Sequence, residues 1–338
     1  MRSALGKTKK DAMPRKRPND DLMLEAARLY YEGGLDQAQV AKQIQVSRSY
    51  VSRLLSEARQ NGLVEIRVRH PLPVAEDLQD TLLKRFALRE ARVLAVQGWD
   101  YQETLKRLGA LAARFLESAL RQHDRLGIGW GTAIHATVQA FNPHRFLGAQ
   151  VVQMIGGLGA ANPEIDGTDL ARRLAEKLGD QYRYLQAPLI VESTAVCEAL
   201  MREPSIKEVL ALARKAHLAV IGIGTINKTY SSLLRAGFVT DAALRDLEEH
   251  GVVGDVCCRH FDLSGRVVDV ELNDRVVGID IKSLKRIPRV IGIAGGTAKA
   301  PAILGALRGH LVNVLITDDR TAREVLRLDD ESRLQSST

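Results

Sequence analysis

Short apolar runs of strand length alternate with longer amphipathic stretches from about residue 91 onward, and this alternation constrains the fold more than any other feature. Helical stretches of ten or more residues include 101–122, 168–178 and 240–250. The strand-like runs lie at 92–96, 125–129, 150–155, 219–223, 289–294 and 313–317. Such alternation is typical of an α/β domain with a mainly parallel sheet. The sequence therefore predicts this fold class for residues 91–338.

Four of these runs pass directly into glycine-rich turns, at 127–132, 156–159, 222–225 and 295–299. Ligands of open α/β sheets bind outside the carboxyl ends of the strands, where glycines let backbone N–H groups and helix N-termini approach an anion. A single glycine after a strand is often only a tight turn, but four such turns in one domain predict an anion site. The residues of these turns that we expect to contribute are Gly129, Gly131, Thr132, Gly224, Thr225, Gly296 and Lys299.

Other ligand motifs fit the sequence poorly. No Lys-Ser/Thr pair follows the second glycine of 292–299, and the third glycine of a dinucleotide fingerprint is missing after 127–132. We therefore expect no nucleotide or other cofactor. The three cysteines, Cys197, Cys257 and Cys258, lack metal-ligand spacing, so we expect reduced thiols and no metal site.

Charge is concentrated near the N-terminus. The net charge is +7, and residues 1–70 hold 14 Lys and Arg against 8 Asp and Glu. A basic head suggests a polyanionic partner, although basic N-terminal tails are common. Residues 1–20 lack periodicity, which predicts a disordered arm that either follows DNA phosphates or is a solvated tail. Without an apolar run of about 20 residues or a signal peptide, we expect a cytoplasmic protein with no membrane contact.

Periodic structure in the head predicts a helix from about Asp21 to the Gly33-Gly34 pair. Asp36 stands at an N-cap position with Gln39 three residues later, which indicates a capping box at the start of a helix over 37–43. Ser47 is the next N-cap candidate, before a helix that ends at about residue 60.

The spacing of apolar residues in this helix pair matches a helix-turn-helix. Ala41 and Ile44 on the first helix face Val51 and Leu54 on the second, although Gln45 stands in the turn where such motifs often have glycine. The second helix would expose hydrogen-bond donors that can reach base edges in the major groove. Alternatively, the pair is a hairpin used for protein contacts. The DNA-binding residues that we predict are Gln37, Ser47, Arg48, Ser49, Tyr50, Ser52 and Arg53.

These patterns divide the 338 residues into a small and a large domain. Residues 21–70 form the expected DNA-binding domain, which ends with a strand at 63–69 whose basic face resembles a wing. Pro71 and Pro73 interrupt the chain there. We predict a linker helix within 71–90, whose apolar stripe belongs to the core or to a contact between subunits, and an effector-binding and oligomerisation domain at 91–338.

The chain resembles the SorC-type sugar-responsive transcription regulators, which are also grouped with the deoxyribonucleoside-type repressors. The resemblance extends from about Asp21 over nearly the whole chain. It rests on the helix-turn-helix segment and on GIGWGTAI, VVQMIGG, YLQAPLIV, GIGT, GDVCCRHFDLSG and IGIAGGTAKAPAILGALRGHLVNVLITDDRTAREVL. It implies a domain folded like the sugar-phosphate isomerases and deaminases, an operator-DNA partner, a sugar, polyol or sugar-phosphate effector, and a homotetramer.

By position, the resemblance assigns the phosphate loop to Gly131, Thr132 and Ala133, with Lys299 reaching in from the Gly-Gly turn. The sugar end would be lined by Gln153, Gly157 and Asp255. Many relatives carry two hydroxyl residues in the first loop, whereas this chain has Thr132 followed by Ala133. That departure leaves both a phosphorylated effector and a free sugar or sugar alcohol open.

The alternative is a sugar-phosphate isomerase-like enzyme fused to a DNA-binding head. Asp255 with Lys299 could move protons on a linear sugar. However, the sequence shows no clear second acid or base, and single histidines such as His135 and His260 are more often packing residues. We therefore predict a regulator of a carbohydrate or polyol operon, without catalytic residues.

Overall fold

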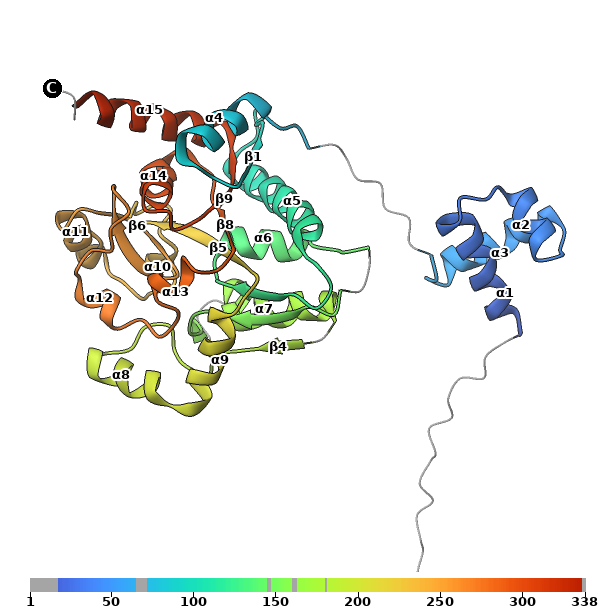
Figure 1. Ribbon diagram of the computed structural model, residues 1–338, viewed down its shortest axis with the longest axis horizontal. Helices are drawn as coiled ribbons and strands as arrows, with labels where there is room; N and C mark the ends of the chain where they lie inside the picture. Colours follow the sequence, from blue (N-terminus) through green and yellow to red (C-terminus); the bar gives the residue numbers. More distant parts are fainter. Residues whose placement is uncertain (1–17, 65–71, 145–146, 160–162, 180, 336–338) are drawn as a thin grey trace, which may run out of the picture. The chain divides into compact units, whose positions relative to one another are not determined.

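The computed structural model describes residues 18–64, 72–144, 147–159, 163–179 and 181–335. The chain divides into two compact units, Met1–Pro71 and Leu72–Thr338, which are described separately below (Figure 1). Most of the expected N-terminal arm and of the expected wing strand at 63–69 lie outside the described residues. No helix in the described part of the chain is long and apolar enough to span a bilayer.

The smaller unit is helical around one apolar cluster that includes Met23, Val40, Val51 and Leu54. Its first helix begins at Pro18, not at Asp21, so the last residues of the predicted arm are helical. The elements are α1 (Pro18–Ala27), the π-helical turn η1 (Arg28–Glu32), α2 (Gln37–Gln43) and α3 (Arg48–Gln60).

Both predicted N-caps of the helix pair are confirmed. The Asp36 carboxylate accepts the Gln39 N–H at 2.8 Å, and the Gln39 side chain accepts the Asp36 N–H at 2.9 Å. The Ser47 hydroxyl accepts the Tyr50 N–H at 3.2 Å. Gln45, in the turn, has φ +58°, the left-handed conformation for which glycine is usual.

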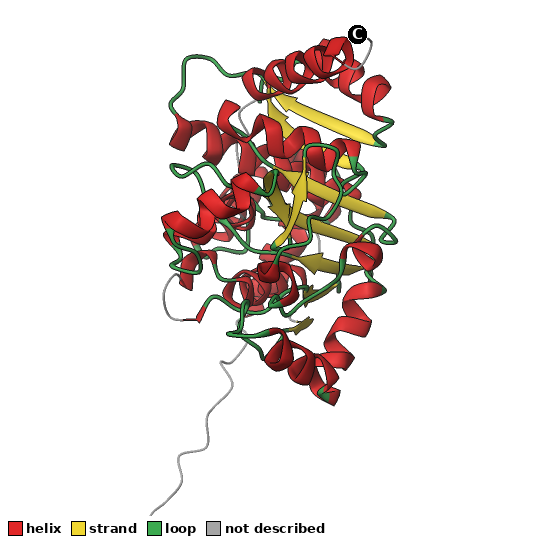
Figure 2. Cartoon of the chain, turned by 90° about the vertical axis from the view of Figure 1, so that its left-hand side faces the viewer, coloured by secondary structure: helices red, strands yellow, loops and turns green. Residues whose placement is uncertain are grey.

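Among the described residues, the larger unit is built on a nine-stranded sheet, which confirms the predicted α/β class (Figures 1 and 2). Seven strands are parallel in the order β1-β9-β8-β5-β2-β3-β4, while β6 and β7 form an antiparallel hairpin beside the end of β5. The bounds are β1 (Glu90–Leu94), β2 (Arg125–Ile128), β3 (Gln150–Gln153), β4 (Gln181–Arg183), β5 (Leu218–Thr225), β6 (Val252–Val256), β7 (Arg259–Asp262), β8 (Arg289–Ile293) and β9 (Val314–Asp318).

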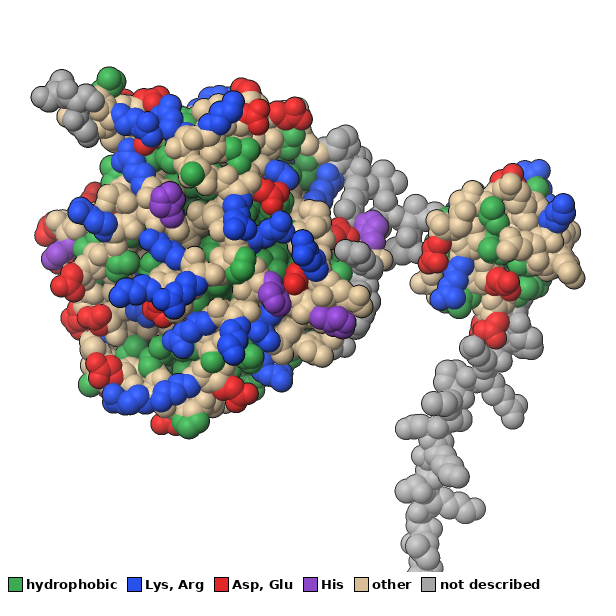
Figure 3. Space-filling view, in the orientation of Figure 1, with side chains coloured by type: hydrophobic (Ala, Val, Ile, Leu, Met, Phe, Trp, Pro, Cys, Tyr) green, Lys and Arg blue, Asp and Glu red, His purple; other side chains and the backbone are tan. Residues whose placement is uncertain are grey.

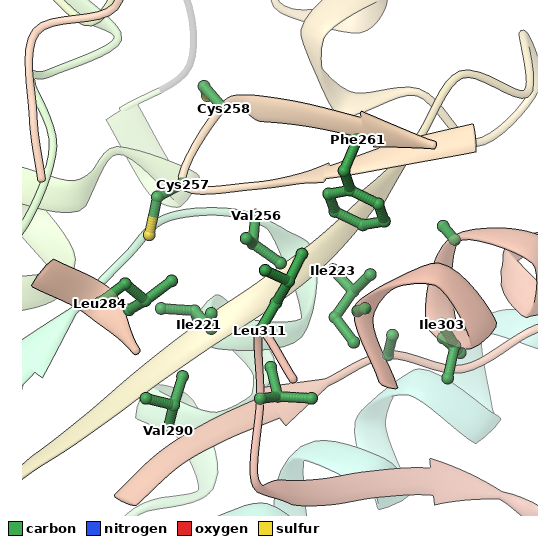
Figure 4. Packing of buried hydrophobic residues seen from close by; sticks show 14 of the residues in the cluster. Ile221, Ile223, Val256, Cys257, Cys258, Phe261, Leu284, Val290, Ile303 and Leu311 are labelled. Carbon is green, nitrogen blue, oxygen red and sulfur yellow. The ribbon is translucent and has the colours of Figure 1, made fainter. Parts of the chain in front are cut away.

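Helices cover both faces of this sheet. Successive residues of a strand alternate between two buried clusters, as Val93 and Leu94 do. One cluster includes α5 (Tyr101–Ala119), α6 (Thr132–Ala140) and α7 (Gly167–Leu178). The other, part of which Figure 4 shows, includes α4 (Glu76–Phe86), α9 (Pro204–Arg214), α10 (Ser232–Arg235), α11 (Asp241–Glu249), α14 (Ala300–Arg308) and α15 (Asp319–Gln335).

Shorter or peripheral elements complete the larger unit. These are the 3-10 turns η3 (Pro163–Ile165) and η4 (Thr297–Lys299) and the helices α8 (Thr194–Arg202), α12 (Glu271–Asp274) and α13 (Ile281–Leu284). On the face shown in Figure 3, Lys and Arg side chains lie among Asp and Glu. This mixture agrees with the small net charge that remains for the sequence outside the basic head.

The structure corrects several predicted elements. The helix within 71–90 is not a linker, because Leu78, Leu82 and Phe86 of α4 are buried in the core of the larger unit. The helix expected to reach residue 122 ends at Ala119, because Leu120 is extended and buried. Strands β4, β6 and β7 were not predicted, and the ends of the predicted strands differ from the observed ones by at most two residues.

Candidate functional site

A pocket lies at the carboxyl ends of β2 and β5. The chain order reverses between these neighbouring strands, because β3 and β4 follow on one side while β8 and β9 follow on the other. Such switch points are where open α/β sheets bind ligands. The lining residues are Gly129, Trp130, Gly131, Thr132, Ala133, Ile155, Ile221, Gly222, Ile223, Gly224, Ser232, Leu233, Asp255, Cys257 and Lys299.

Lys299 supplies a buried positive charge to this pocket. It ends the η4 turn after Gly296, only 8% of its surface is exposed, and its ammonium donates a hydrogen bond to the Ile223 carbonyl at 3.0 Å. Burial lowers the pKa of Lys299 to about 8; the Asp255 carboxylate opposes this shift and the Arg235 guanidinium adds to it. Because an ammonium has three donors, the side chain can also bind an anion.

Asp255, on β6, lies in the same pocket and directly opposite Gly224 of β5. Any Cβ at Gly224 would lie 1.9 Å from Asp255 Oδ1, so only glycine leaves space for this carboxylate. The carboxylate accepts the Cys258 N–H at 3.1 Å. Burial raises the pKa of Asp255, against the effects of His260, the Cys258 N–H and Lys299.

The N-terminus of α6 opens on the pocket beside these charges. Its N-cap is Gly131, and no side chain caps the helix. The first backbone N–H groups of a helix have no partner within the helix, and together with the helix dipole they favour an anion. The Thr132 hydroxyl adds a donor, whereas Ala133 contributes none.

The remaining walls are apolar or neutral. Trp130 donates its indole N–H to Cys258 Sγ at 3.3 Å, which orients the ring in the loop between β2 and α6. Burial raises the pKa of the Cys257 thiol to about 12, so this side chain is uncharged. The lining side chains that can carry charge are therefore Lys299 and Asp255.

Seven of the predicted effector residues line this one pocket: Gly129, Gly131, Thr132, Ala133, Gly224, Asp255 and Lys299. The other four do not. Gln153 is fully buried, where its side-chain oxygen accepts the Leu185 N–H at 3.0 Å, and Gly157 lines a separate cavity near α7. The Thr225 hydroxyl accepts the Asn227 N–H at 3.2 Å, and the Gly296 N–H is donated to Asp318.

Several pocket residues were missing from the predicted set. Ser232 and Leu233 come from α10, a four-residue helix too short to produce a periodic pattern. Cys257 lies in the turn of the β6–β7 hairpin, which was not predicted. Ile221, on β5, and Ile155, just beyond the end of β3, read as ordinary core positions in the sequence.

Six of the seven predicted DNA-binding residues lie in the first two turns of α3 or at its N-cap, whereas Gln37 begins α2. Arg48, Ser49, Ser52 and Arg53 are exposed, as is Ser47. Gln37 and Tyr50 are half-buried, and the Arg53 guanidinium lies 5.3 Å from the centre of the Tyr50 ring. This arrangement leaves two arginines and two hydroxyls exposed in the first two turns of the helix.

Comparison with known proteins identifies the family. Residues 72–327 match the family described as "Putative sugar-binding domain". The deoxyribonucleoside regulator of Bacillus subtilis is 32% identical over 310 residues, which cover 92% of this chain and 98% of that protein. The chain belongs to the SorC-type family of sugar-responsive transcription regulators.

Further relatives agree with this assignment. The transcriptional regulator LsrR of Enterobacter sp. is 32% identical and covers 91% of this chain and 94% of its own. The crystal structure of the full-length sorbitol operon regulator SorC from Klebsiella pneumoniae superposes with a TM-score of 0.69 at 27% identity, covering 91% of this chain and 99% of that chain. These relatives are named as regulators and not as enzymes, which agrees with the predicted regulator.

Proposed function

We propose that this protein is a DNA-binding regulator of a carbohydrate or polyol operon whose operator binding responds to a phosphorylated sugar in the β2–β5 pocket. The observation that carries the phosphorylated effector is the joint presence of buried Lys299 and the uncapped N-terminus of α6 in one pocket. Both groups favour an anion, and neither is needed to bind a neutral sugar.

The rest of the pocket suits the sugar part of such an effector. The Asp255 carboxylate can accept hydrogen bonds from sugar hydroxyls. Trp130, Ile155 and Leu233 provide apolar surface against the carbon skeleton. Because Ala133 replaces a hydroxyl residue, we assign the phosphate to the α6 backbone N–H groups, the Thr132 hydroxyl and the Lys299 ammonium.

We assign DNA binding to the exposed end of α3 in the smaller unit, with Arg48 and Arg53 as its charged residues. Two arginines on one recognition helix can read guanine or bind phosphate. From the family resemblance, we further propose that the protein acts as a cytoplasmic homotetramer.

A thermal-shift screen of the full chain against sugars, polyols and their phosphates tests the pocket assignment. A ligand present at 100 times its Kd stabilises a protein by about 2.7 kcal/mol. We expect the largest shift from a phosphorylated sugar, and we expect Lys299→Ala to lose most of it. Lys228→Ala is the matched control, because the Lys228 side chain is 71% exposed and lies outside the pocket. Equal shifts for phosphorylated and free sugars in all three proteins would contradict the proposal.

A further inference from the structure

Two adjacent carboxylates stand at the junction of β9 and α15. Asp318 ends the strand and Asp319 begins the helix, and both residues are buried. Neither lines the β2–β5 pocket. Their hydrogen bonds nevertheless connect two segments that are far apart in the sequence. Asp318 binds the turn before Lys299, and Asp319 binds the segment after β1.

Asp318 holds the turn that carries Lys299. Its Oδ2 accepts the Gly296 N–H at 2.9 Å and the Thr321 hydroxyl at 2.7 Å. Gly296 has φ +97°, and a Cβ there would lie 3.1 Å from the Tyr101 ring. The position of the turn therefore depends on the Asp318 carboxylate and on the absence of a side chain at Gly296.

Asp319 holds the segment that follows β1. Its Oδ1 accepts the Val96 N–H at 3.0 Å, and its Oδ2 accepts from Arg323 at 2.7 Å. The neighbouring Ala95 N–H is donated to the Pro73 carbonyl at 2.9 Å, and Val74 forms a β-bridge with Leu94. Asp319 thus binds Val96, the residue next to the two, Leu94 and Ala95, that pair with residues 73–74. The chain enters the larger unit at residues 73–74.

We propose that Asp318 and Asp319 are a positioning pair that transmits a displacement of the Lys299 turn to the segment through which the DNA-binding unit is connected. The two residues are consecutive, with Cα atoms about 3.8 Å apart, so a shift of the backbone at Asp318 reaches the backbone of Asp319 directly. Tyr101 provides a second link between the same two segments. Its ring lies beside Gly296, and its backbone directly continues residues 95–100. The pair would link effector binding to DNA binding, so the inference rests on the proposed function.

Hydrogen exchange in the full chain tests this pair without an effector. Gly296→Ala displaces the turn, and Asp318→Ala, which removes the acceptor of the Gly296 N–H, is a second perturbation in case the first variant does not fold. We expect either variant to accelerate exchange of the Ala75 and Ala95 amides by at least about fivefold, the lower end of usual coupling between sites. Amides of β3 serve as the internal reference for global unfolding.

The same perturbations are then repeated in Asp319→Ala, Asp319→Asn and Glu331→Ala backgrounds. Asp319→Ala should abolish the response at Ala75 and Ala95 while exchange at 295–299 still changes. Asp319→Asn should restore part of it, because the amide oxygen can accept the Val96 N–H. Glu331→Ala, which removes an exposed α15 ion pair with Arg327, should leave the response intact.

A response confined to 295–299, or one that persists in Asp319→Ala, would overturn the proposal. Adding inorganic phosphate to the wild-type protein separates this inference from the proposed function. Absence of any phosphate effect on exchange at 295–299 counts against the anion site alone, because the response to Gly296→Ala does not involve a ligand.

Discussion

The affinity of the pocket for a phosphorylated sugar should fall as the pH rises through about 8, because buried Lys299 loses its proton there. A pKa below the ordinary 10.5 means that the charged form is lost at a lower pH than for an exposed lysine. If only the charged form binds the phosphate, the apparent Kd equals the intrinsic Kd divided by the protonated fraction. The phosphate monoester remains a dianion in this range, because its second pKa is about 6.

The expected size follows from that pKa. The protonated fraction is about three-quarters at pH 7.5 and about one in eleven at pH 9, so the affinity should fall about eightfold. Titration calorimetry with the sugar phosphate that gives the largest thermal shift measures this ratio. Lys299→Arg should keep its charge and show a flat profile, and Lys228→Met should behave like the wild type. A flat wild-type profile, or an Arg variant whose affinity falls in parallel with the wild type, would refute the reasoning.

Three further predictions concern other parts of the chain. Arg48→Ala and Arg53→Ala should each weaken binding to a specific duplex by about 1–3 kcal/mol where the arginine reads a base. Where the arginine binds phosphate, the variant should instead show a smaller dependence of affinity on salt concentration. Unchanged affinity in both variants would reject the α3 assignment. Effector binding should alter the fluorescence of Trp130, and this change should persist in the Trp99→Phe variant. A change that is lost in Trp99→Phe would contradict the assignment of the effector to the β2–β5 pocket. Gln45→Gly should stabilise the helix pair by up to about 1 kcal/mol, because glycine relieves the strain of the left-handed φ of +58°. Hydrogen exchange in α2 and α3 should then be slower, and faster exchange would show that the turn is unstrained.

Features fixed by local chemistry could be predicted from the sequence. The capping box of Asp36 and Gln39 involves four consecutive residues, so its spacing alone defines it. The glycine-rich turns after β2 and β8 were located in the same way, because strand, turn and helix are contiguous there. The turn expected at 222–225 was wrong, because these residues continue β5 and pair with β6. Lys299 could be assigned to the site from the sequence because it follows such a turn.

The composition of the pocket could not be predicted in full, because it depends on strand order and side-chain direction. Thr225 follows Gly224 directly, yet only Gly224 lines the β2–β5 pocket. Gln153 ends β3, but its side chain binds Leu185 and Thr168. The β6–β7 hairpin escaped prediction because Cys257 and Cys258 occupy left-handed turn positions, at φ +50° and +58°, where Asn-Gly is the usual signal.

The central claim is that one chain couples a sugar-phosphate pocket to DNA binding. Its most direct test is fluorescence anisotropy with a duplex selected from random sequence by the full chain, measured with and without the effector. The effector should change the DNA affinity of the wild type by about 5- to 150-fold, while Lys299→Ala should bind the duplex equally well and show no response. An effector that binds the wild-type protein but leaves its DNA affinity unchanged would contradict the claim.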